Sequence, residues 1–112
     1  MKIWIRLIVA GLSISAANAG KTYTQSQINE MVNTGNFPEQ KLVDTKTHKT
    51  SFRACKAAAN RMMADIGATY PVEEIVTTRA LYMVKMFTNT GTVLITCSKP
   101  DETMVLSISD YQ

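Results

Sequence analysis

The chain has 112 residues, of which 46% are apolar and 19% are charged. This length and balance fit one small globular domain and exclude a second one. The formal charge of +3 would favour a nucleic-acid or membrane-surface partner if every residue belonged to the mature protein.

The first 19 residues predict a secretory signal peptide. Lys2 and Arg6 form a basic start, residues 7–14 form an apolar segment, and Ala-Asn-Ala at 17–19 has the small-x-small form of a cleavage site. The apolar segment is shorter than the roughly 20 residues that span a bilayer, which disfavours the alternative of an uncleaved anchor helix. Cleavage would remove both of these basic residues and lower the formal charge from +3 to +1.

We therefore expect residues 20–112 to form a single domain in the periplasm of a Gram-negative bacterium, or secreted from it, without stable membrane insertion. In an oxidising compartment, the two cysteines of the chain, Cys55 and Cys97, predict one disulfide. Redox-active pairs usually have the form Cys-x-x-Cys, so the wide spacing indicates a structural bond. Closing this loop would stabilise the fold by about 4 kcal/mol in the chain-entropy model.

The exported part begins with a short predicted helix. Thr24 or Ser26 provides an N-cap, the helix continues to about Asn33, and Gly35 ends it. The segment 40–47 then alternates only weakly and predicts an edge strand or an extended loop. The apolar stripe of the helix consists of Ile28, Met31 and Val32.

A longer helix is predicted from Ser51 to Ile66. Thr50 or Ser51 can cap its start, and Gly67 follows the last periodic residue as a C′ glycine would. The residues expected to face the core are Phe52, Cys55, Ala59, Met62, Met63 and Ile66.

Beyond Gly67 the composition changes to β-branched and aromatic residues separated by turns. The pattern predicts an α+β fold, with one or two N-terminal helices packed on a C-terminal antiparallel meander of three to four strands. The strands are expected at 72–78, 80–88, 92–98 and 104–111, with turns at 89–91 and 99–102.

Strand alternation places Cys97 on an apolar face, so a bond to Cys55 would join the long helix to the sheet. Leu94 and Val105 are apolar residues that point to the opposite face. The residues sharing the face of Cys97 are Val93, Ile95, Met104, Leu106 and Ile108.

The strand at 80–88 is apolar on both sides. Either the long helix covers one side and the first helix or the segment 40–47 covers the other, or the second side is an exposed patch that marks a partner site. The first side has Ala80, Tyr82, Val84 and Met86. The second side, which we predict as the partner-binding set, has Leu81, Met83, Lys85 and Phe87.

Basic residues are concentrated between positions 41 and 61, where Asp44 alone opposes them. This basic band is either a solvated face or a surface for an acidic partner. Phe52 is its only aromatic residue, whereas single-strand nucleic-acid binders stack bases on several aromatics, so no nucleic-acid partner is expected. The band contains Lys41, Lys46, Lys49, Arg53, Lys56 and Arg61.

Catalytic and metal-binding groups are sparse. His48 is the only histidine, and no phosphate-binding loop or nucleophile motif occurs. Thioethers at Met62, Met63, Met83 and Met86 suit Cu(I), but core positions favour gap filling for most of them. We predict no catalytic residue, no metal, no cofactor and no enzyme; the alternative is a small secreted hydrolase or toxin that uses His48.

Three short segments support a family resemblance: F-R-A-C at 52–55, Y-P-V at 70–72 and T-C-S-K-P-D at 96–101. In composition and order they resemble small exported proteins encoded in transfer regions of conjugative plasmids, of the KikA type. The resemblance implies a periplasmic accessory role and no catalytic residues. The expected function is a disulfide-stabilised protein-interaction module, an accessory of a cell-envelope or conjugative-transfer process, with an envelope or secreted protein as its partner.

Overall fold

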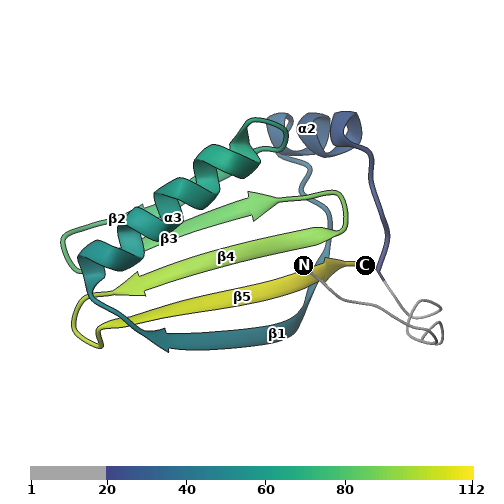
Figure 1. The fold of residues 1–112 in the computed structure, drawn as a ribbon. Coiled ribbons are helices and arrows are strands. Elements are labelled where there is room, and N and C mark those ends of the chain that lie inside the picture. Colours follow the sequence, from purple (N-terminus) through teal and green to yellow (C-terminus); the bar gives the residue numbers. More distant parts are fainter. Residues whose placement is uncertain (1–19) are drawn as a thin grey trace.

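The computed structural model describes residues 20–112, so the predicted signal peptide lies outside the described residues. Within them, five strands form one antiparallel sheet in the order β1-β5-β4-β3-β2. One helix crosses a face of this sheet and a shorter one lies at its end (Figure 1). In chain order the elements are α2 (Gln25–Asn33), β1 (Gln40–Lys49), α3 (Phe52–Gly67), β2 (Val72–Thr77), β3 (Leu81–Phe87), β4 (Gly91–Ser98) and β5 (Thr103–Tyr111).

The α+β class is confirmed, but the predicted strand count and helix placement are wrong. The additional strand is β1, the edge-strand alternative predicted for 40–47, which pairs with β5 and forms one edge of the sheet. Residues 41–49 are all exposed, so no buried side marks this strand in the sequence. Because β1 lies between α2 and α3 in the chain, the helices do not both precede the sheet.

Helix α3 buries a narrow stripe against one face of the sheet. Its N-cap is Ser51, whose hydroxyl accepts a hydrogen bond from the Ala54 N–H at 3.1 Å. Cys55 and Ala59 are fully buried. They pack with the core side chains of the strands, which are Tyr82, Val84, Met86, Ile95, Cys97 and Met104.

Two details of the predicted core, at Met62 and Ala80, and one detail of the predicted helix end, at Gly67, are wrong. Met62 is 36% exposed because adjacent helical residues are about 100° apart, and Met63 occupies the position over the sheet. Gly67 is the last helical residue rather than a left-handed C′ glycine, and Ala68 is the C-cap in the right-handed region. Ala80 is exposed and lies in the turn before β3.

Helix α2 closes one end of the sheet on the side opposite α3. Its N-cap is Thr24, as one of the two predicted alternatives, and Gly35 follows the helix with a φ of +79°. Its one buried residue, Ile28, packs with Phe87 and Tyr111. Strand alternation points both aromatic side chains away from α3. No helix among residues 20–112 has the length and apolarity to cross a membrane.

Candidate interaction surface

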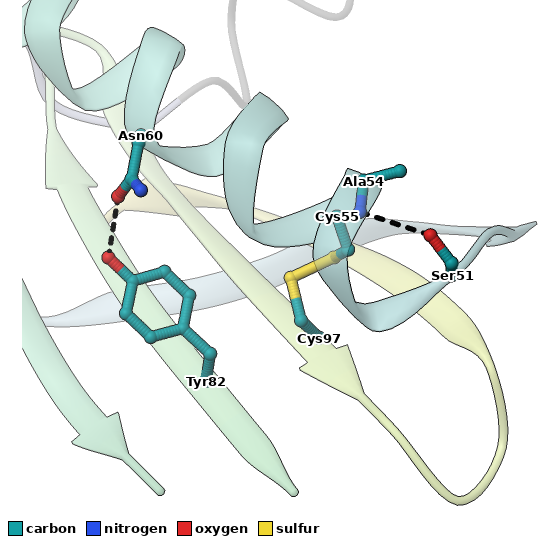
Figure 2. Close-up of a disulfide and its surroundings, with 6 residues drawn as sticks. All are labelled: Ser51, Ala54, Cys55, Asn60, Tyr82 and Cys97. Atoms are coloured by element: carbon teal, nitrogen blue, oxygen red, sulfur yellow. Dashed lines mark hydrogen bonds between the residues drawn. A yellow bond between two sulfur atoms is a disulfide. The ribbon is translucent and has the colours of Figure 1, made fainter. Parts of the chain in front are cut away.

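A disulfide joins α3 to β4, as predicted from the two cysteines (Figure 2). The Cα atoms of Cys55 and Cys97 are 5.8 Å apart, within the usual range for a disulfide. Both residues are completely buried, and neither is a free thiol. This burial, inside the larger core, supports a structural role for the bond.

A polar cluster lies on the same helix-covered side. The hydroxyl of Tyr82 is 2.8 Å from Asn60 Oδ1 and 3.0 Å from Glu74 Oε2, so one proton has two acceptors within reach (Figure 2 shows the Asn60 bond). Burial, followed by the hydrogen bond and the charge of Glu74, raises the pKa of Tyr82 to about 12. Lys56 Nζ lies 5.1 Å from the centroid of the tyrosine ring.

Sequence analysis missed this cluster because Asn60 and Glu74 are exposed residues without a motif. One signal was available. A tyrosine on a buried strand face needs a partner for its hydroxyl, and Asn60 lies one residue after Ala59 of the buried stripe. The cluster anchors α3 to β2 and β3, beside the disulfide anchor on β4.

On the opposite side of the sheet, no helix of residues 20–112 lies over the centre (Figure 1). The strand register arranges this open face in rows of neighbouring side chains. The central row runs from β2 to β1 as Val76, Met83, Thr96, Val105 and Thr47. Each of these is half-buried except the exposed Thr47 at the edge.

Two further rows flank the central one. They are Leu81, Ser98, Thr103 and Lys49 on one side, and Glu73, Lys85, Leu94, Ser107 and Thr45 on the other. Five apolar side chains are therefore surrounded by hydroxyls, with charges at the margins. We define the apolar patch of the open face as Val76, Leu81, Met83, Leu94 and Val105.

Three of the four predicted partner-binding residues lie on this open face. Leu81, Met83 and Lys85 are half-buried, whereas the exposure predicted for Phe87 is wrong, since Phe87 is only 1% exposed. Helix α2 covers Phe87 through Ile28. The ring of Phe37 stacks on the ring of Phe87, with the two ring centroids 5.6 Å apart. The second side of β3 is therefore covered at its end, by α2 and Phe37, and half-buried at its centre.

The ammonium group of Lys85 lies 5.5 Å from the Phe87 ring centroid. This contact holds the lysine toward the covered end and away from Met83. The patch also extends further than predicted, because the register brings Val76 and Val105 to either side of the central row. Sequence alternation alone located Leu94 and Val105 on this face but could not show which strands are neighbours.

The predicted basic band does not form one surface. Lys56 lies over Tyr82 in β3, whereas Lys41, Lys46 and Lys49 belong to β1 at the sheet edge. Strands β5 and β4 separate these two groups, a distance of about 14 Å at the usual strand spacing. The β1 lysines thus form a separate basic edge.

His48 is exposed on β1, where its neighbour across the ladder is Met104. Asp44 lies four residues away on the same side of the strand, at about 13 Å by the strand rise. Among residues 20–112 no three His, Cys, Asp or Glu side chains are grouped to hold a metal ion.

The helix-covered side of the sheet is thus occupied by the disulfide and the Tyr82 cluster. The open face carries the apolar patch and β1 carries the basic edge. The large apolar side chains of residues 20–112 that are exposed lie outside the patch and are Phe37, Leu42, Val43, Met62 and Ile75. Comparisons with known proteins add no functional assignment: no family model, curated protein or solved structure matches this chain.

Proposed function

We propose that the protein is a disulfide-stabilised interaction module of an extracytoplasmic compartment, and that it binds a protein partner through the open face of its sheet. The observation that carries this proposal is the apolar patch of five half-buried side chains on a face whose centre no helix of residues 20–112 covers (Figure 1). The solvent-facing side of an antiparallel sheet normally carries polar residues. A contiguous apolar patch on such a face marks a partner site.

The disulfide supports the proposed compartment. A buried, fully formed Cys55–Cys97 bond is compatible with an oxidising environment, and the predicted signal peptide directs the chain there. The resemblance to exported proteins of plasmid transfer regions supports an accessory role at the cell envelope or in conjugative transfer. The partner would be an envelope or secreted protein with an apolar surface of matching size.

The open face is tested by placing a charge at its centre. In Met83→Glu, a half-buried carboxylate would disfavour an apolar contact but leave the α3 side of the sheet unchanged. We expect the purified variant to keep the circular-dichroism spectrum of the wild type and to lose capture of cross-linked partners from an envelope fraction.

Met62→Glu is the matched control, since it makes the same change on the exposed flank of α3. It should retain the partners that Met83→Glu loses. A folded Met83→Glu protein that captures every wild-type partner would contradict the proposed surface. An unfolded Met83→Glu protein would also contradict it, because it would mean that this face is packed too tightly to accept a partner.

A further inference from the structure

We infer that the outer edge of β1 binds an extended acidic peptide segment, which adds to the sheet as a sixth strand. This edge is a second surface, distinct from the open face, and does not depend on it. Strand β1 pairs with β5 on one side, and no described residue pairs with its other side. Edge strands with free backbone groups are templates for strand addition.

The hydrogen-bonding pattern shows which backbone groups are free. The Thr50 N–H donates to the Glu102 carbonyl at 3.0 Å. In an antiparallel ladder, consecutive residues alternate between facing the partner strand and facing away. Counting back from Thr50 through the regular register, the N–H and C=O groups of Thr45, Thr47 and Lys49 point away from β5. The Thr45 N–H donates to Asp44 Oδ1 at 2.9 Å, so the outward N–H groups open to an added strand are those of Thr47 and Lys49.

The usable edge is limited by a bulge. The register between β1 and β5 shifts between Leu42 and Asp44 but is regular from Asp44 to Lys49. These six residues are all exposed. The opposite edge of the sheet, β2, has its own register shift between Glu74 and Val76 and therefore offers shorter regular stretches. The β1 edge is the better template.

The charged side chains of β1 determine which kind of strand can pair with its outer edge. Lys46 and Lys49 lie within the regular stretch, with Asp44 at its end. Directly opposed like charges destabilise strand pairing and opposite charges stabilise it. Within the regular stretch, a second copy of β1 would bring two lysines against two, with one Asp44 from each copy to offset them. The ammonium group of Lys49 also donates to the Asp101 carbonyl at 3.1 Å. The same lysines would favour an added strand with carboxylates.

The register also sets the spacing of those carboxylates. Lys46 and Lys49 are three residues apart, so their side chains lie on opposite faces of the sheet. An added antiparallel strand would place one acidic residue opposite each, also three positions apart. A suitable probe is the capped synthetic hexapeptide Thr-Glu-Val-Val-Glu-Thr, and its control is the same peptide with lysine in place of both glutamates.

The test is an NMR titration of the oxidised ¹⁵N-labelled protein with each peptide. We expect the acidic peptide to shift the amide signals of Thr47 and Lys49 and to slow their hydrogen exchange, with no effect from the lysine peptide. Thr47→Pro removes an outward N–H that the sheet does not use, a position where an edge strand tolerates proline. It should keep the fold and weaken acidic-peptide binding at least tenfold.

Charge reversal provides a second, independent variant. The double substitution Lys46→Glu and Lys49→Glu should lose the acidic peptide and gain the lysine peptide. Met83→Glu should bind the acidic peptide as the wild type does, which separates this edge from the open face.

Three results would overturn the inference. They are amide shifts confined to other strands, undiminished binding by a folded Thr47→Pro variant, and concentration-dependent self-association that Thr47→Pro abolishes in sedimentation experiments. The last would identify a second copy as the occupant of the edge.

Discussion

At the scale of single residues, the Cys55–Cys97 bond makes the strongest stability prediction. Cross-linking restricts the unfolded chain, and the 42-residue separation corresponds to about 4 kcal/mol as an upper estimate. The double variant Cys55→Ala and Cys97→Ala should therefore lower the free energy of unfolding in urea by up to about this amount. Non-reducing mass spectrometry of the wild type should find the linked peptide pair, and two free thiols would contradict the structure.

Tyr82 makes a pH-dependent prediction. Its pKa is raised from 10.0 to about 12 by burial and by Glu74, so the unfolded chain loses this proton at lower pH than the folded protein does. The free energy of unfolding should thus fall as the pH rises from about 10 to about 12, and then level off. In Tyr82→Phe this alkaline loss should be smaller, as measured by urea unfolding at a series of pH values. Burial also raises the pKa of Tyr111 to about 12. Tyr111 should therefore account for the part of the alkaline loss of stability that remains in Tyr82→Phe. Equal slopes in the two proteins would contradict the prediction.

At the scale of elements, α2 depends on one side chain. Ile28 is completely buried against Phe87 and Tyr111, so Ile28→Ala leaves a cavity and should destabilise the protein by about 2–5 kcal/mol. Ile75→Ala is the matched control, because Ile75 is 47% exposed and its truncation should change stability little. Thermal unfolding of both variants checks the prediction, and equal midpoints would show that α2 is not anchored in this way.

The elements also show what the sequence could predict. Helix α3 and strands β3 to β5 follow from periodicity, since each has a buried or half-buried apolar side that repeats at its own period. Strand β2 has no buried residue and follows instead from its β-branched composition. Strand β1 has no buried side from 41 to 49, so the sequence leaves an edge strand and an extended loop as alternatives for 40–47, and the pairing with β5 decides for the strand. The open face shows the same limit: alternation gives a side chain its face, but only the strand order makes Val76, Met83 and Val105 members of one row.

At the scale of the whole molecule, the sheet separates two cores of unequal size. The larger, on the α3 side, contains eight buried residues and the disulfide. The smaller, under α2, contains Ile28, Phe87 and Tyr111. Local stability follows the number of buried apolar contacts, so the two sides should open with different free energies.

Native-state hydrogen exchange would measure this difference directly. The inner amides of β3 and β4 should exchange only through global unfolding, because the larger core and the disulfide hold these strands to α3. The amides of α2 should exchange through a smaller opening that leaves the sheet folded, because Ile28 is the only residue of that helix buried in the smaller core. Ile28→Ala should lower the free energy of the local opening that exposes α2. The inner amides of β4 should still exchange only through global unfolding. Identical opening free energies for α2 and β4 in the wild type would mean that the two cores unfold as one unit.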